Sequence, residues 1–516
     1  MTFAQRKTAA CERLRDKQTE KGQREFLMRK NILLSVGLFL LAGMILHAQS
    51  KQGLYVGDAF QGEMDLYDSL DWIAANAQDG GEYSIVLGAS IAASSSVLDY
   101  SGKSVTVSLK SSGEVLQVSY ATRSPSSSLF TVKEGVTFVL EKGVELVGRP
   151  SASRPPVTVD GGNFIMNGGA VKDSKVDHSR DWLGGGVGVV RGTFTMNDGT
   201  ISGNSCDSGA GVYVGESASF IMNNGTINNN SARDDYDYDG ARGGGVYVDG
   251  TFTMVDGTIS NNACRSAANS DHRNGGGVHV SKSGTFIMQG GIIKNNSDRG
   301  IYVGSYRDFM RHQSGSVTMN GGTVTGNTKG GVLVDGIFTM NKGTISKNTV
   351  TDDDGAGVYV RNGSFTMNDG EIIENKTTGF YSPYSFSGRQ GGGGGVYVAN
   401  HTTFTMNGGV ISKNIATEHA AGGGGIFVDG TFTMNDGIIS GNSTTKSGGG
   451  ILVAGGTFSK SNAAGVIYGS DAAEDKANKA NQYGHAVYTK NGSRDTTARA
   501  TMALDSKKQG AEGGWE

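Results

Sequence analysis

The sequence predicts an all-β fold: a right-handed, single-stranded parallel β-helix of about ten or more coils, with a short N-terminal capping helix. The segment GGGVYVDGTFTMVDGTISNN at 243–262 recurs, with small changes, about ten times between residues 160 and 460. Within each copy apolar and polar residues alternate, as they do in half-buried strands. Corners such as NDG and NGG, which supply positive φ angles, separate these strands. A repeat of this length is one unit stacked on itself, and parallel crossovers are nearly always right-handed.

The register of the repeat is set by the aromatic residue of each TFTM segment. These anchors are Phe164, Phe194, Phe220, Phe252, Phe286, Val317, Phe338, Phe365, Phe404 and Phe432, with a degenerate copy at Phe458. A Met follows two residues after the first ten anchors, and in most copies an Asn follows ten residues after the anchor. We expect the Phe, Met, Val and Ile residues to form the core. We expect the Asn residues to form a hydrogen-bonded ladder along the stack.

The chain is divided into five parts by composition. These are a charged leader that is non-native or disordered (1–27), a signal peptide (28–48), an N-terminal cap with irregular first coils (49–160), the β-helix repeats (161–490) and a polar C-terminal tail (491–516). The signal peptide is indicated by a charged start, an apolar run and an acceptable cleavage site, LHA ending at Ala48, before Gln49. In the cap, apolar residues at helical spacing predict a helix over 66–77, which covers the open end of the core.

The signal peptide predicts an exported protein, extracellular or at the cell surface and associated with the outer membrane. The apolar run is too short for a comfortable membrane span, so no transmembrane segment is expected in the mature chain. Cys206 and Cys264 occupy equivalent positions two coils apart, about 9.6 Å at the usual strand spacing, so we expect two free thiols. The net charge is −3 and no basic stripe is present, which argues against nucleic acid as a partner. The sequence leaves the oligomeric state open.

An acidic insertion is the candidate metal site. Asp235, Asp237 and Asp239 have the D-x-D-x-D-G spacing of a calcium loop, but the closing Glu of an EF-hand is missing. The insertion is therefore either a calcium loop or a solvated acidic loop, and no other cofactor is indicated. The strand faces carry no paired carboxylates, and no nucleophile triad or zinc pattern is found, so no catalytic residue is assigned.

Two groups of aromatic residues are candidates for ligand binding. One lies in the long insertion at 376–390 and contains Phe380, Tyr381, Tyr384 and Phe386. The other is a stripe of rings that point outward from the VYV-type segments, among them Tyr213, Tyr247, Tyr302, Tyr359 and Tyr397. Exposed aromatic rings bind glycans or proteins, whereas stacked rings also stabilise parallel strands by themselves. For the insertion, the alternatives are a contact surface and rings that fold down onto the coils. For the stripe, they are ligand binding and stacking that stabilises the strands.

The repeat units, the capping region and the signal peptide together resemble bacterial secreted right-handed parallel β-helix repeat proteins, over roughly residues 50–490. The similarity is greatest to adhesin-like members and more distant to the polymorphic outer membrane proteins, without their autotransporter barrel. The resemblance implies a secreted or cell-surface protein that displays variable loops for adhesion, with a polysaccharide or a host-surface glycan or protein as its partner and no catalysis. The alternatives are a polysaccharide-active lyase or hydrolase that uses loop carboxylates, and a purely structural envelope protein.

Overall fold

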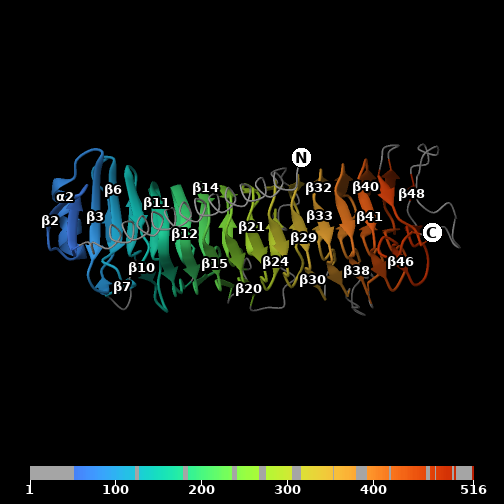
Figure 1. The fold of residues 1–516 in the computed structure, drawn as a ribbon, viewed down its shortest axis with the longest axis horizontal. Coiled ribbons are helices and arrows are strands. Elements are labelled where there is room, and N and C mark those ends of the chain that lie inside the picture. The colour runs from blue at the N-terminus through green and yellow to red at the C-terminus, as the bar shows by residue number, and fades with distance from the viewer. Residues whose placement is uncertain are drawn as a thin grey trace, which may run out of the picture. The chain divides into compact units, whose positions relative to one another are not determined.

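A computed structural model describes most of the chain. The described residues are 51–121, 127–177, 184–234, 241–266, 275–304, 315–351, 354–378, 392–417, 420–460, 465–470, 472–490, 493–494 and 514–515. The chain divides into a unit of residues 1–51 and a unit of residues 52–516. The second unit is a parallel β-solenoid of about 12 turns, which confirms the predicted fold class. Its coils follow one another in chain order along the solenoid, as the run of colours from blue to red shows (Figure 1). The right-handed sense of the coil stays a prediction.

Each coil contributes strands to three long columns. The first column holds the VYV-type strands β5 (Ser96–Leu98), β8 (Phe130–Lys133), β17 (Val246–Val248), β21 (Gly275–Val280), β24 (Arg299–Val303), β27 (Val332–Val334), β31 (Val358–Val360), β35 (Val396–Val398), β39 (Ile426–Val428), β43 (Ile451–Val453) and β47 (Val487–Thr489). The second holds the TFTM-type strands β3 (Gly81–Leu87), β6 (Val105–Ser111), β9 (Val136–Leu140), β18 (Thr251–Met254), β22 (Thr285–Met288), β25 (Ser316–Met319), β28 (Ile337–Met340), β32 (Ser364–Met367), β36 (Thr403–Met406), β40 (Thr431–Met434), β44 (Thr457–Lys460) and β48 (Ser493–Arg494). The third holds the TIS-type strands β4 (Ile91–Ala93), β7 (Leu116–Tyr120), β10 (Val144–Val147), β15 (Thr226–Asn228), β19 (Thr258–Ser260), β23 (Ile292–Lys294), β26 (Thr323–Thr325), β29 (Thr344–Ser346), β33 (Glu371–Ile373), β37 (Val410–Ser412), β41 (Ile438–Ser440) and β45 (Val466–Ile467).

Three early strands run through the corners instead of stopping at them. Strands β11 (Val157–Lys172) and β12 (Val187–Ser202) pass through all three columns, and β14 (Val212–Met222) passes through the first two. The ladders between coils are parallel and in the register of the repeat; for example, Phe220 pairs with Phe252 and Met222 with Met254. The spacing of the TFTM anchors therefore predicted the strand pairing correctly.

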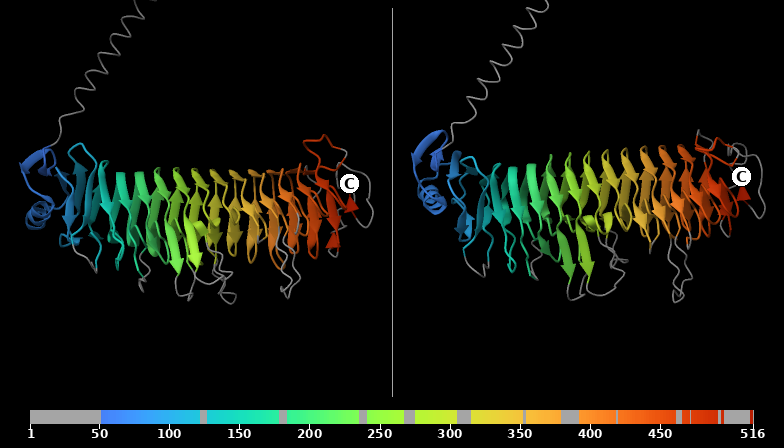
Figure 2. Two further views of the ribbon diagram at one scale, coloured as in Figure 1. Left: turned by 90° about the horizontal axis from the view of Figure 1, so that it is seen from below. Right: turned by 60° about the horizontal axis from the view of Figure 1, so that its bottom comes forward.

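A fourth, short column follows the ladder Asn, where sequence analysis expected only a corner. Its strands are β13 (Ser205–Cys206), β16 (Ser231–Asp234), β20 (Ala263–Ser266), β30 (Thr349–Val350), β34 (Lys376–Thr377), β38 (Ile415–Ala416), β42 (Ser443–Thr444) and β46 (Lys479–Ala480). In Figure 2 the green strands β16 and β20 extend beyond the neighbouring coils on this side. Most of these strands have two residues, which is too short for a visible alternation of apolar and polar residues, so the repeat pattern did not reveal the column.

The predicted helix caps the first coil. Helix α2 (Leu66–Asn76) begins after Asp65, whose carboxylate accepts a hydrogen bond from the Asp68 N–H at 2.9 Å. Its residues Leu66 and Ile73 are buried in the core. Strand β1 (Gly53–Val56) pairs antiparallel with β2 (Ala59–Gly62) and with β3, and these elements lie at the same end (Figure 1). At the other end β49 (Gly514–Trp515) pairs antiparallel with β47, within the segment predicted as a tail.

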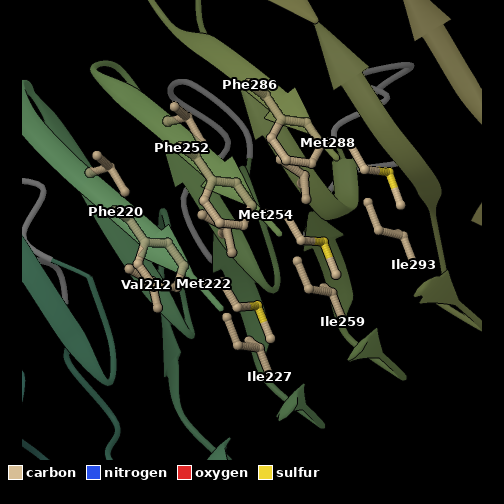
Figure 3. Close-up of a cluster of buried hydrophobic side chains, with 14 of the residues drawn as sticks. Val212, Phe220, Met222, Ile227, Phe252, Met254, Ile259, Phe286, Met288 and Ile293 are labelled. Carbon is tan, nitrogen blue, oxygen red and sulfur yellow. The ribbon is translucent and has the colours of Figure 1, made fainter. Parts of the chain in front are cut away.

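The core is a set of columns of identical side chains. Phe, Met, Ile and Val from successive coils point into the solenoid and lie above one another (Figure 3). The centroids of Phe194, Phe220, Phe252 and Phe286 are separated by 4.7 Å at each step, with nearly parallel rings. Stacked pairs of this kind contribute about 0.5–1.5 kcal/mol each beyond their buried area. The core assignment of the Phe and Met stripes is thereby confirmed.

The buried Asn column forms the expected ladder. The Asn348 Nδ2 donates to the Val324 carbonyl at 3.0 Å and to the Asn375 Oδ1 at 2.9 Å. The Asn348 Oδ1 in turn accepts from the backbone N–H and the side-chain amide of Asn327. The same pattern runs from Asn204 to Asn478. Sequence analysis did not include Asn478 in the ladder. Each ladder Asn therefore satisfies backbone groups in neighbouring coils.

Glycine is required where coils approach each other most closely. A Cβ on Gly357, just before β31, would lie 2.5 Å from the Gly395 carbonyl oxygen and 3.1 Å from the Asn375 amide nitrogen. At the NDG corner Gly370 has φ +103°, a conformation that residues with a side chain rarely adopt. Close approach and positive φ thus explain why glycine recurs at fixed repeat positions.

Candidate functional site

The outward stripe of rings on the first column is covered. The Val residues on either side of Tyr247 point into the core, and Tyr247 points away from it, as predicted. Tyr302 and Tyr397 nevertheless keep only 2% of their surface exposed, whereas Tyr213 is half-buried. The later part of the stripe forms a second apolar cluster, which consists of Tyr302, Leu333, Tyr359, Tyr397, Ala399, Phe427, Leu452 and Tyr488. This packing agrees with the structural alternative, while ligand binding by the same rings stays a prediction.

The stripe tyrosines bond to aspartates of the following coil. Tyr302 and Tyr397 donate from their hydroxyls to Asp335 and Asp429, each at 2.8 Å, and Tyr213 donates to Asp249 at 3.2 Å. Burial, reinforced by Asp335, raises the pKa of Tyr302 well above its ordinary value. The hydroxyls therefore stay protonated and act as hydrogen-bond donors between coils.

Two arginines complete a polar network beside the rings. The Nε of Arg361 donates to Asp335 at 2.8 Å, its terminal nitrogen contacts the other carboxylate oxygen, and its guanidinium lies 5.9 Å from the Tyr302 ring centre. Arg299 is fully buried and donates to the carbonyl oxygens of Asp354 and Gly355, each at 3.1 Å. Its guanidinium lies 5.7 Å from the ring centre of Tyr359. Arg299 therefore connects the coil of β24 with the coil of β31, which is two coils further along the chain.

His279 interrupts the run of tyrosines. It is 4% exposed and packs between Tyr247 and Tyr302, at centroid distances of 5.0 and 4.7 Å. Its Nδ1 has no hydrogen-bond partner among the described residues. Burial, with a smaller contribution from Arg242, holds the pKa of His279 well below its ordinary value, so the ring is neutral.

An exposed polar surface on the second column is the feature that sequence analysis did not single out. We define the polar face as the outward residues of β25, β28, β32, β36 and β40, with the corner residue that follows each strand. Its members are Ser316, Thr318, Asn320, Ile337, Thr339, Asn341, Ser364, Thr366, Asn368, Thr403, Thr405, Asn407, Thr431, Thr433 and Asn435. None of these residues is charged and none is buried. The signal was present in the recurrent string T-x-T-x-N, whose alternate residues share one side of a strand.

The amides of the polar face are already ordered. Asn341 donates to Asn320 and Asn368 donates to Asn341, each at 2.7 Å. Asn407 donates to Asn368 and Asn435 donates to Asn407, each at 2.8 Å. The molecule therefore has two Asn ladders, one buried and one exposed, on each of these coils.

Several predicted site residues lie outside the described part of the chain. These are the acidic residues Asp235, Asp237 and Asp239 and the aromatic residues Phe380, Tyr381, Tyr384 and Phe386. Within the described ranges no group of three or more His, Cys, Asp or Glu residues is arranged to hold a metal ion. The thiols of Cys206 and Cys264 are free, as predicted. Among the described helices none has the length and apolar character needed to cross a membrane.

No protein family, curated protein or solved structure matches this chain.

Proposed function

We propose that this protein is an exported, surface-displayed solenoid that presents variable loops to bind a glycan or a host-surface partner, without catalysis. One insertion, residues 305–314, separates β24 from β25 and therefore lies at a different corner of the coil. The observation that carries the proposal is that most of the long insertions share one edge. They leave after the ladder Asn or the short fourth-column strand and return at the first column. Asn375 and Val396 are 21 positions apart, whereas Asn327 and Val332 are 5 apart.

The insertions leave the register of the coils unchanged. The longest one lies between β34 and β35, yet Val358 of β31 still pairs with Val396 and Val360 with Val398. The core and the Asn ladder therefore tolerate sequence change at this edge. Binding residues are often carried by loops that a rigid framework positions, and this arrangement supports a display role. The signal-peptide pattern at 28–48 supports export.

The experiment that tests the proposal removes an insertion and keeps its coil. In the variant, residues 376–395 are replaced by Thr-Lys-Gly-Gly, the natural spacer at 328–331. Residues 49–516, intact or trimmed, are incubated with immobilised neutral and acidic polysaccharides and with a host glycan panel. We expect the intact protein to be retained and the trimmed variant to lose retention on at least one probe.

A matched trim at a second insertion provides the control. Replacement of residues 231–245 by the same four-residue spacer tests whether any shortened loop has the same effect. If the intact protein is retained on no probe, the binding proposal fails. If the polymers become shorter during incubation, the protein is an enzyme and the proposal is wrong in a different way.

A further inference from the structure

We propose that the polar face binds an extended, uncharged polysaccharide chain that lies along the solenoid axis. This inference rests on the proposed function and names both the ligand class and the surface. The loops at the insertion edge and the strands of the polar face are different parts of the coil, so the two proposals are tested by different variants.

The first argument is charge. All positions of the polar face are uncharged in five successive coils, although 18% of the residues of the chain are charged. The neighbouring outward positions of the third column, in contrast, include Glu371. An anionic polymer would find no cation on the polar face, so acidic polysaccharides and nucleic acid do not fit it.

The second argument is hydrogen bonding. Hydroxyl and amide groups are both donors and acceptors, as are the hydroxyls of a neutral sugar. The threonines at the centre of the face are Thr318, Thr339, Thr366, Thr405 and Thr433, one from each coil without interruption. Only Ile337 interrupts the polar character of the face, with 47% of its surface exposed. An apolar protein surface would gain little from such a face, because its burial would leave the hydroxyls and amides without partners.

The third argument is order. The Asn320–Asn435 ladder fixes the orientation of each amide before any ligand arrives. A ligand that binds pre-ordered side chains avoids the entropy cost of immobilising each of them. Ordered, exposed amides are therefore suited to a ligand that makes many contacts, each of which is weak.

The fourth argument is the repeat itself. Neighbouring strands are about 4.8 Å apart, so the same three groups recur at that spacing along the axis. A β-linked hexose in an extended chain advances by a similar distance, which allows each coil to contact one sugar. Because five coils repeat the contact, even weak contacts at each sugar add up along the chain.

The test uses a variant that charges the face without introducing repulsion between strands. Thr339→Lys, Thr366→Glu and Thr405→Lys place opposite charges on neighbouring strands, which favours cross-strand pairing. The matched control makes Thr323→Lys, Thr344→Glu and Glu371→Gln on the third column of neighbouring coils, which changes the net charge by the same amount as the test variant. Circular dichroism and thermal unfolding of both variants establish that the solenoid is intact.

Retention is measured by affinity electrophoresis of residues 49–516 in gels that contain soluble β-1,4-glucan, β-1,4-mannan or xylan, or anionic polygalacturonate. We expect a neutral polymer to retard the intact protein and the control variant equally, and the charged-face variant at least tenfold less. Raising the salt concentration should leave the retardation of the intact protein unchanged, because no charges are involved.

Each other outcome overturns the inference. If the charged-face variant is retarded as strongly as the intact protein, the polysaccharide binds elsewhere, and the proposed function survives while this inference fails. Retardation by polygalacturonate alone contradicts the ligand class. If no polymer retards the intact protein, this inference fails, and the proposed function then depends on the host glycan panel.

Discussion

At the scale of single residues, the position before each buried ladder Asn decides the path of the backbone. Gly203, Gly326 and Gly441 have positive φ there, and so do residues with side chains such as Lys347 and Lys413. A left-handed conformation costs a residue with a Cβ roughly 1–2 kcal/mol, whereas it costs glycine little beyond entropy. At corners where a residue with a side chain takes this conformation, the backbone is therefore locally strained.

Replacing the residue with a side chain at one such corner by glycine should stabilise the protein. We expect Lys413→Gly, where φ is +56°, to raise the free energy of unfolding by about 0.5–1 kcal/mol. Lys376→Gly is the control, because Lys376 is also exposed but lies in the extended strand β34, where glycine should destabilise by a similar amount. Urea unfolding of both variants measures the difference. Equal effects of the two substitutions would contradict the assignment of strain to the corner.

Lys460 is a second residue that departs from the repeat. It occupies the Met position of its coil, in register with Met434, and is 3% exposed. Burial lowers the pKa of Lys460, and the Asp436 carboxylate offsets this only in part. We expect Lys460→Met to raise the free energy of unfolding at pH 7, because burial disfavours the ammonium and methionine restores the apolar column.

The stability gained by Lys460→Met should decrease as the pH rises. Below the lowered pKa of the folded state, Lys460 is charged in both states and its burial penalty is complete. Between that pKa and the ordinary value near 10.4, the unfolded state binds more protons, so the stability of the lysine protein rises with pH. The difference between the two proteins in thermal unfolding should therefore be smaller at pH 10.5 than at pH 7. A difference that is constant over this range would contradict a buried ammonium.

At the scale of elements, the two Asn ladders allow a direct comparison within one coil. Asn375 is fully buried, and its Oδ1 accepts from the backbone N–H and the amide of Asn348, while its Nδ2 donates to Asn414. Asn375→Ala leaves these buried groups without partners, and we expect a loss of about 2–4 kcal/mol. Asn368→Ala in the exposed ladder should cost less than about 0.5 kcal/mol, because water replaces the lost partner. The urea midpoints of the two variants test this, and similar midpoints would show that burial does not set the strength of the ladder.

The elements also show which features the sequence could predict. The repeat of Phe, Met and Asn predicted the three columns and their register, because stacking identical coils leaves no other consistent pairing. The short strands such as β34 were missed because two residues show no alternation, and the antiparallel pair β1–β2 was missed because it occurs once, outside the repeat. The outward direction of Tyr302 and Tyr397 followed from alternation, but their coverage did not, because alternation describes one strand and coverage depends on neighbouring segments. The residues of the polar face could be recognised in the sequence as the recurrent string T-x-T-x-N. The order of its amides could not, because it is shown by hydrogen bonds such as the one from Asn341 to Asn320.

At the scale of the whole molecule, a solenoid is a sum of similar coils, and this gives a final prediction. Removal of residues 252–285 joins Thr251 to Phe286 and deletes one complete coil. Strands β14 and β15 then face β22 and β23, which previously paired with β18 and β19, and β17 faces β24, which previously paired with β21. Each remaining strand keeps an equivalent partner, Asn230 faces Asn296, and the partly satisfied His279 is lost. Because the strands of each coil pair only with those of its neighbours, we expect a folded protein with parallel strands, whose thermal midpoint lies close to that of the intact chain. Removal of residues 252–268 alone deletes half a coil, places polar residues in the core columns and should prevent cooperative unfolding. The two variants are compared by circular dichroism, and equal loss of structure in both would contradict a fold held together by nearest-neighbour stacking. The polar face lies outside the deleted coil, so retention on the neutral polysaccharide should also be unchanged in the full-coil variant.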